Sequence, residues 1–134
     1  MEKNERVMVV CPDRTRGRNV RNYLIKAGIE AKSIVEVDNI SSALANLMVY
    51  EFVMIFSDHN GAINALEFLE QISTWEEGRF NHIPFVIIAK KGLPGDVIKA
   101  RNFGVTSFVL FNPPVTNSVE FLRKLKDILE GRII

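Results

Sequence analysis

The sequence predicts an α/β fold, a three-layer sandwich in which a five-stranded parallel sheet is covered by helices on both faces. Five short runs of large apolar residues recur along the chain, and unbroken runs of this kind are typical of strands buried on both faces. Each run is followed by a segment whose apolar residues recur at helical spacing, so strand and helix alternate. The chain has 134 residues, which suits one domain and is too short for a closed eight-stranded barrel.

The first strand is predicted at Val7–Val10, where four apolar residues stand in a row. Asp13 or Thr15 can cap the helix that follows, because short polar side chains accept hydrogen bonds from the free N–H groups of a first helical turn. This helix is expected to reach Ala27, since Gly28 behind it is a typical helix terminator.

The second and third strands are predicted at Ser33–Val37 and Phe52–Asp58, the latter a run of five large apolar residues that ends in a serine and a carboxylate. Ser41 or Ser42 can cap the helix between these strands. A third helix is predicted at Ala62–Thr74, where apolar residues again fall at helical spacing.

The last two strands are predicted at Pro84–Ala89 and Ser107–Phe111, with a short helix at Asp96–Phe103 between them. Thr116 or Ser118 is expected to cap a final helix. Its inward positions, taken from the apolar spacing, are Val119, Leu122, Leu125, Ile128 and Leu129.

Composition places the chain among ordinary soluble proteins, because 47% of its residues are apolar, 25% are charged and the formal net charge is +1. A charge this small gives no general attraction to nucleic acid or to acidic membranes, so neither is an expected partner. No apolar run approaches the roughly 18 to 20 residues that cross a membrane. The charged start of the chain does not resemble a signal peptide, and the single cysteine, Cys11, cannot form an internal disulfide. We therefore expect one cytoplasmic domain over residues 1–134.

Several short motifs follow one another in a set order along the chain. They are Val9-Val10 before a helix that ends in Ala27-Gly28, Val35–Asn39 followed by Ala43-Leu44, Asp58 at the end of the third strand, Ile83-Pro84 at the start of the fourth, and Phe103–Val105 before Ser107–Val109. With this ordered set the sequence resembles a CheY-like response-regulator receiver domain over essentially its whole length. The resemblance implies a flavodoxin-like sheet with strand order 2-1-3-4-5, a role in two-component signal relay, and Asp58 at the position of the phospho-accepting aspartate.

The resemblance fails at most of the positions that handle the phosphoryl group. Receivers hold Mg²⁺ with two acids after the first strand, whereas this chain places Cys11 and Pro12 there, with Asp13 one position later. The family's Ser or Thr after the fourth strand is matched by Ala89, and its Lys after the fifth strand is matched by Phe111. The family pattern therefore predicts a degenerate site.

Asp58 and the backbone carbonyl of Asn60 are what remains of the metal site, and they make a poor cage for an ion that requires near-octahedral oxygen ligands. Phosphoryl transfer depends on neutralising the developing negative charge, mostly through the metal and a lysine. We therefore predict no bound metal or other cofactor, no catalytic activity and no phosphorylation. The chain is interpreted as a pseudo-receiver that acts through protein–protein contacts.

Two other functions stay open. In one, Asp58 is a working phospho-acceptor of a phosphorelay, with Mg²⁺ bound and Asp13 recruited as a substitute acid. In the other, the chain is a flavodoxin-like small-molecule binder, although residues 11–17 are a poor match to the Gly-, Ser- and Thr-rich loop that cradles a phosphate. A plain structural interpretation of Asp58 is open as well, as a solvated acid that caps nearby backbone N–H groups.

The resemblance places a protein partner on the face formed by the helix at 96–103, the strand at 107–111 and the last helix. Apolar residues gather in this part of the sequence, which favours a protein contact or a homodimer. They are Phe111, Pro113–Val115 and Ile133–Ile134. In receivers the aromatic residue that matches Phe108 moves inward on phosphorylation. Because Phe108 has no hydroxyl and Ala89 provides no switch partner, we expect Phe108 to stay buried in one rotamer.

Other chemistry-bearing residues have ordinary structural interpretations that we prefer. Five basic residues on or before the first helix are interpreted as a solvated helix face rather than a patch for nucleic acid or an acidic partner: Arg14, Arg16, Arg18, Arg21 and Lys26. Cys11 is interpreted as a buried filler rather than a redox switch, and His59 as a loop residue without a special role. Trp75 and Phe80 either pack over the end of the third helix or form an exposed contact.

Overall fold

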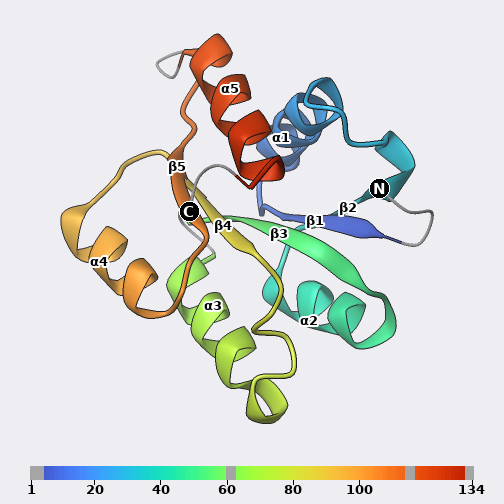
Figure 1. The fold of residues 1–134 in the computed structure, drawn as a ribbon, viewed down its shortest axis with the longest axis vertical. Helices are drawn as coiled ribbons and strands as arrows, with labels where there is room; N and C mark the ends of the chain where they lie inside the picture. The colour runs from blue at the N-terminus through green and yellow to red at the C-terminus, as the bar shows by residue number, and fades with distance from the viewer. Residues whose placement is uncertain (1–4, 60–62, 114–116, 132–134) are drawn as a thin grey trace.

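Five parallel strands form one sheet in the order β2-β1-β3-β4-β5 in a computed structural model, which describes residues 5–59, 63–113 and 117–131 (Figure 1). The strands are β1 (Arg6–Val10), β2 (Ile34–Val37), β3 (Phe52–Asp58), β4 (Phe85–Ala89) and β5 (Ser107–Leu110). Each neighbouring pair of strands is parallel. The predicted fold class and strand order are therefore confirmed.

Helices connect successive strands and cover both faces of the sheet. They are α1 (Arg14–Lys26), α2 (Ile40–Val49), α3 (Ala65–Thr74), α4 (Pro94–Asn102) and α5 (Ser118–Leu129), with short 3-10 turns η1 (Ala31–Ser33) and η2 (Trp75–Glu77). Helices α1 and α5 pack together on one face, and α2, α3 and α4 cover the other (Figure 1). The result is the three-layer sandwich that the alternation of strand and helix predicts.

Side chains of the central strands alternate between two apolar cores, one under α1 and α5 and the other under α2, α3 and α4. In β1, Val9 enters the first core and Met8 enters the second; β4 alternates in the same way, and β3 does so from Met54 onward. Strands buried on both faces explain the unbroken apolar runs in the sequence. Phe80 is buried in the second core and Trp75 packs against it, so these two aromatic residues pack inward.

Helix caps follow the predicted chemistry, although the residue differs in α2. Asp13 caps α1 as predicted, since its Oδ1 accepts from two N–H groups of the first turn at 2.9 and 3.2 Å. Helix α2 is capped by Asn39, whose Oδ1 accepts from the N–H of Ser42 at 2.8 Å. Ser41 and Ser42, the predicted caps, lie inside the first turn, where their own N–H groups are among those that need a partner.

The start of α5 also differs from the prediction. Asn117 caps this helix by accepting from two N–H groups of the first turn. Of the two predicted caps, Ser118 is the first helical residue and Thr116 lies outside the described residues. Val119, expected to face inward, is 76% exposed. The buried residues of α5 are Phe121, Leu125 and Ile128.

Several element boundaries shift slightly. Ser33 belongs to η1 rather than to β2, and α4 begins at Pro94, where the missing N–H of a proline needs no partner. Strand β5 ends at Leu110, although the N–H of Phe111 still donates to the backbone of β4 at 2.8 Å. The predicted start of the third helix, Ala62, lies outside the described residues.

Candidate functional site

Asp58 is the last residue of β3 and lies at the carboxyl edge of the sheet, where β1 and β4 flank its strand. The residue is 3% exposed, and its Oδ1 accepts from the backbone N–H of His59 at 3.0 Å. The plain interpretation of Asp58 is therefore wrong about solvation, since the carboxylate is buried, but right that it accepts from a nearby backbone N–H. Side chains from the segment after β1 and from α1 close over the carboxylate and remove it from water.

The guanidinium of Arg16 reaches from α1 onto this carboxylate. Its Nε donates to Asp58 Oδ1 at 3.1 Å, and its Nη1 donates to the carbonyl oxygen of Phe111, the residue after β5. The guanidinium carbon lies 5.0 Å from the centre of the Phe111 ring, within the range of a cation–π contact. Arg16 is 7% exposed. The prediction of a solvated helix face is therefore wrong for Arg16, which instead joins α1 to the ends of β3 and β5.

Helical spacing explains why Arg16 faces inward. Arg16, Val20 and Leu24 are four residues apart and are all buried. Residues at this spacing share one face of a helix. The same spacing is present in the sequence, where an arginine opens an otherwise apolar stripe, but grouping this arginine with its charged neighbours hides the signal.

Arg16 and Asp58 form an ion pair with both partners almost excluded from water. Taking a charge out of water costs several kcal/mol even after relaxation, and the attraction between the partners offsets this cost only when their geometry is good. The Nη2 atom of Arg16 is buried and has no hydrogen-bond partner in the part of the chain that the structure describes. The two charges therefore depend on each other, and removing either one takes away the opposite charge that lies 3.1 Å from the other.

The second carboxylate oxygen of Asp58 accepts from Cys11, whose Sγ lies 3.5 Å from Oδ2. Burial of the thiol, and next the negative charge of Asp58, raise the pKa of Cys11 from 9.0 to about 12. The thiol therefore stays protonated at neutral pH and donates to the carboxylate. Cys11 is also 5% exposed, which agrees with its interpretation as a buried residue of the core.

The donor set around Asp58 does not fit Mg²⁺, the ion that the resemblance implies. Cys11 and Pro12 follow β1, and the carboxylate of Asp13 caps α1. The positive charge of Arg16 already lies against Asp58, where it repels a second cation. Among the described residues, no group of three His, Cys, Asp or Glu side chains is placed to hold a metal ion.

The other predicted site positions are apolar where the structure describes them. Ala89 is buried at the end of β4, and Phe108 is partly buried against the core under α2, α3 and α4. Phe111 is also buried, with its ring stacked on Phe121 of α5 at 4.4 Å between centres. The prediction that Phe111 contributes to an exposed apolar edge is therefore wrong, since its ring fills the core between α1 and α5. Asn60, the remaining trace of the metal site, lies outside the described residues.

His59 has a structural role that the sequence does not indicate. Its Nδ1 accepts from the N–H of Ala65 at the start of α3, at 3.0 Å, and its Nε2 lies 3.2 Å from Oδ2 of Asp96 in the first turn of α4. An imidazole whose Nδ1 accepts carries its proton on Nε2, so Nε2 is the donor to Asp96. The interpretation of His59 as a residue without a special role is wrong, because it joins the ends of β3, α3 and α4.

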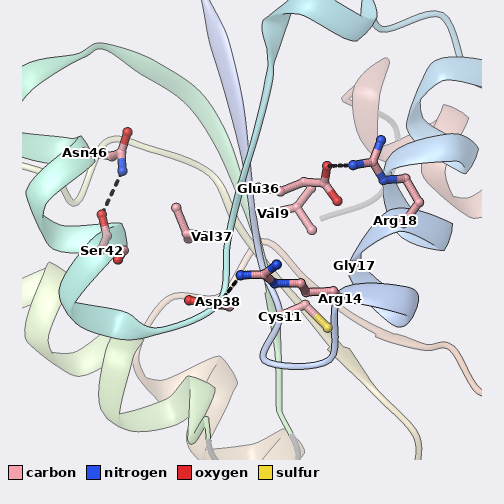
Figure 2. A pocket seen from close by; sticks show the side chains of 10 residues that line it. All are labelled: Val9, Cys11, Arg14, Gly17, Arg18, Glu36, Val37, Asp38, Ser42 and Asn46. Atoms are coloured by element: carbon pink, nitrogen blue, oxygen red, sulfur yellow. Dashed lines mark hydrogen bonds and ion pairs between the residues drawn. The ribbon is translucent and has the colours of Figure 1, made fainter.

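A cavity of about 530 Å³ lies beside the site, between the start of α1 and the first turns of α2 (Figure 2). Its charged residues pair across the opening, with Arg14 3.7 Å from Asp38 and Arg18 3.3 Å from Glu36. Arg21 approaches Glu36 as well, at 3.7 Å. The remaining arginines of α1 thus form ion pairs with the end of β2 and the residue after it, and neither Arg16 nor Asp58 lines this cavity.

The sheet order, the two helical layers and the position of Asp58 at the end of β3 define a receiver fold of the flavodoxin-like type. No protein-family model and no curated protein matches the sequence. Solved structures match it closely in shape, and the fold is that of response-regulator receiver domains. Among the described residues, no helix is long and apolar enough to cross a membrane.

Three of the similar structures illustrate the match. A CheY-like response-regulator receiver domain protein from Methanospirillum hungatei is 16% identical, and the alignment covers 96% of this chain and 95% of that one, with a TM-score of 0.72. The chemotaxis protein CheY4 of Vibrio cholerae is 20% identical, with 97% and 98% covered and a TM-score of 0.72. The signal receiver domain of a histidine kinase from Syntrophus aciditrophicus is 18% identical, with 96% and 91% covered and a TM-score of 0.72.

Proposed function

We propose that this chain is a receiver-type module of two-component signalling that acts through protein–protein contacts, without phosphorylation of Asp58. The receiver fold supports the signalling role. The observation that carries the second half of the proposal is the buried ion pair. The guanidinium of Arg16 lies on the carboxylate that a phospho-acceptor must present to a metal ion and a phosphoryl donor.

Charge and access both act against phosphorylation. Two unit charges about 4 Å apart interact by roughly 4 kcal/mol at an effective dielectric constant near 20, so a guanidinium at 3.1 Å strongly opposes entry of Mg²⁺. Both carboxylate oxygens of Asp58 already accept hydrogen bonds, from Arg16, His59 and Cys11. Phosphorylation would have to break these bonds inside a site that excludes water.

The proposed partner surface lies along α4, the end of β5 and the start of α5. Large apolar side chains are exposed there, namely Leu93, Ile98, Leu110 and Val119. Leu110 lies close to the loop before α4. Its Cδ2 is 3.4 Å from the position that a Cβ atom would take if Gly92 were replaced by alanine. Exposed apolar groups of this size favour contact with another protein or with a second copy of the chain. Pro113 is exposed as well, whereas residues 114–115 and 133–134, also predicted for this surface, lie outside the described residues.

Acetyl phosphate and beryllofluoride, each supplied with Mg²⁺, test the proposal. We expect the intact mass of the wild-type protein to show no phosphoryl adduct, and its ¹H–¹⁵N NMR spectrum to stay unchanged on addition of beryllofluoride. An active receiver domain treated in parallel shows that the reagents work. The proposal assigns no catalytic activity and no cofactor to the chain, and it places the module in the cytoplasm.

Two variants make the negative result interpretable. An adduct on the wild-type protein that is absent from Asp58→Asn would overturn the proposal and establish a phospho-acceptor instead. If Asp13→Asn then also lost the adduct, Asp13 would be the substitute acid of that alternative. Asp13 caps α1, so this variant requires a check by circular dichroism that the helix is retained.

A further inference from the structure

We propose that Arg16 couples the charge of Asp58 to the connection between β5 and α5, and so takes the place of an external ligand in setting the partner surface. This inference rests on the proposed function, because it concerns how the same site acts without phosphorylation. It assigns Arg16 the role of a positioning residue. The argument starts from the three chain segments that the guanidinium joins.

Arg16 contacts β3 and the residue after β5 with different atoms. Its Nε binds the carboxylate of Asp58, and its Nη1 binds the carbonyl of Phe111. These two partners are 42 and 95 residues away from Arg16 in the sequence. Phe111 is the first residue after β5 and begins the segment that leads to α5. The side chain of Arg16 in α1 therefore binds the charged group at the end of β3 and also binds the backbone that leads into α5.

The contact continues into α5 through aromatic rings. The guanidinium lies over the ring of Phe111, which stacks on Phe121 of α5 at 4.4 Å between centres. Tyr23 of α1 packs edge-on against both rings, at 5.7 and 5.2 Å. A continuous series of contacts thus runs from Asp58 through Arg16 and Phe111 to the buried face of α5.

The chemistry of the side chain suits this task. A guanidinium is planar and always charged, and its donors point in set directions, so it can bind a carboxylate and a carbonyl in one orientation. A lysine offers a single ammonium group and does not stack on a ring in the same way. The backbone ladder between β3, β4 and β5 also connects these regions, and the N–H of His59 lies 3.0 Å from both the carbonyl oxygen of Ile88 in β4 and Oδ1 of Asp58. The guanidinium differs from these backbone contacts because it joins the Asp58 carboxylate directly to Phe111, the residue after β5.

A double-mutant cycle on amide chemical shifts tests the coupling. Asp58→Asn removes the charge but keeps an oxygen that can accept from Nε of Arg16. We expect this substitution to shift the amides of Phe111 and Asn112 and those of the first turns of α5. In an Arg16→Met background, the chemical-shift changes that Asp58→Asn causes at these amides should be at most a quarter of those seen when Arg16 is present. A purely structural role for Arg16 does not produce this dependence.

A second readout covers the case in which Arg16→Met alone does not fold. Asp58→Asn and the double variant Arg16→Met/Asp58→Asn differ only in the guanidinium, and the double variant has no unpaired charge at this site. Amide hydrogen exchange near Phe111 and in the first turns of α5 should be at least tenfold faster in the double variant. Exchange in β1 and β2 should change by less than threefold.

Arg18→Met is the matched control, because Arg18 is on the same helix and forms an ion pair, but with Glu36 on the other side of α1. It should leave the amides around Phe111 unchanged. The coupling is refuted if the Asp58→Asn shifts reach α5 equally with and without Arg16, or if exchange rises equally in both regions. These measurements use no Mg²⁺ and no phosphoryl donor, so their failure leaves the phosphorylation test untouched, and the reverse also holds.

Discussion

The two sides of α1 carry the same chemistry in opposite environments. On the inner side, Arg16 meets Asp58 at 3.1 Å with 8% of its side chain exposed. On the outer side, Arg14 meets Asp38 at 3.7 Å with 90% of its side chain exposed, and Arg18 meets Glu36 at 3.3 Å. The distances are similar, so distance alone does not rank these pairs. The comparison shows that exposure to water, rather than distance, determines how much each ion pair affects stability.

The inner pair also differs in what it joins. Each outer pair links α1 to the end of β2 or the residue directly after it, whereas Arg16 links α1 to the ends of β3 and β5. The outer pairs can break and exchange with water at little cost. The inner pair cannot, because both partners and the nearby thiol of Cys11 are buried. Only the inner side therefore has the properties of a site.

The largest effect is expected on breaking the inner pair from one side. Arg16→Met removes the guanidinium that lies 3.1 Å from the buried carboxylate of Asp58, and we expect the free energy of unfolding to fall by about 3 to 5 kcal/mol. Denaturant unfolding at neutral pH, followed by circular dichroism, measures the loss. The same substitution at Arg18 is the reference for an arginine on the outer side.

The double variant Arg16→Met/Asp58→Leu separates charge from packing. Because replacing a buried ion pair by apolar groups of similar volume is often neutral or stabilising, we expect it to recover most of the stability that Arg16→Met loses. If Arg16→Met cost no more than Arg18→Met, the difference between the two sides of α1 would not be energetic. If the double variant stayed as unstable as the single one, the loss would come from packing rather than from the charge of the carboxylate.

A smaller, pH-dependent effect should sharpen the same contrast through Cys11. The folded protein raises the pKa of this thiol from 9.0 to about 12, so the unfolded chain loses the proton first as the pH rises. Below about pH 9 the thiol is protonated in both states and contributes no pH dependence. Between about pH 9 and 12 its contribution lowers the free energy of unfolding by about 1.4 kcal/mol per pH unit.

Cys11→Ser isolates this contribution, since a hydroxyl can still donate to Asp58 but does not titrate in this range. Denaturant unfolding of both proteins at several pH values gives two slopes, and the wild-type slope should be the steeper one. Equal slopes would show that burial does not hold the thiol in its protonated form. They would also argue against the exclusion of water from the inner side of α1.

Much of the fold follows from the sequence because its signals are local. The apolar run at Phe52–Asp58 needs both faces of a sheet to cover it, and this requirement alone favours a three-layer sandwich. The strand order came from the resemblance rather than from the apolar pattern. The inward stripe of α5 was harder to predict, because a helix start at Ser118 capped by Asn117 turns Val119 outward, and each residue rotates the helix face by about 100°.

Apart from Asp58 at the end of the third strand, the sequence predicts the candidate site by what it lacks. Cys11, Pro12 and Ala89 could be assigned by counting from strand ends, because their positions depend on the chain nearby. Helical spacing indicates that Arg16 faces inward, but its partners lie 42 and 95 positions away, and the local pattern does not identify them. The same holds for His59, whose partners belong to the starts of two helices. Alignment with a family pattern shows which of the family's site residues are missing. It does not show which other residues contact the site, because those contacts depend on tertiary packing.

The smallest effect is expected on the outer side, where Glu36→Gln removes the acid that Arg18 and Arg21 share. Because these pairs are in contact with water, we expect a loss of roughly 1 kcal/mol or less. The loss should disappear near 1 M salt, where the Debye length is about 3 Å, whereas the loss in Arg16→Met should persist. Asp38→Asn, which frees the exposed Arg14, is the matched control and should change stability even less. A salt-resistant loss in Glu36→Gln as large as that of Arg16→Met would show that burial does not distinguish the two sides of α1.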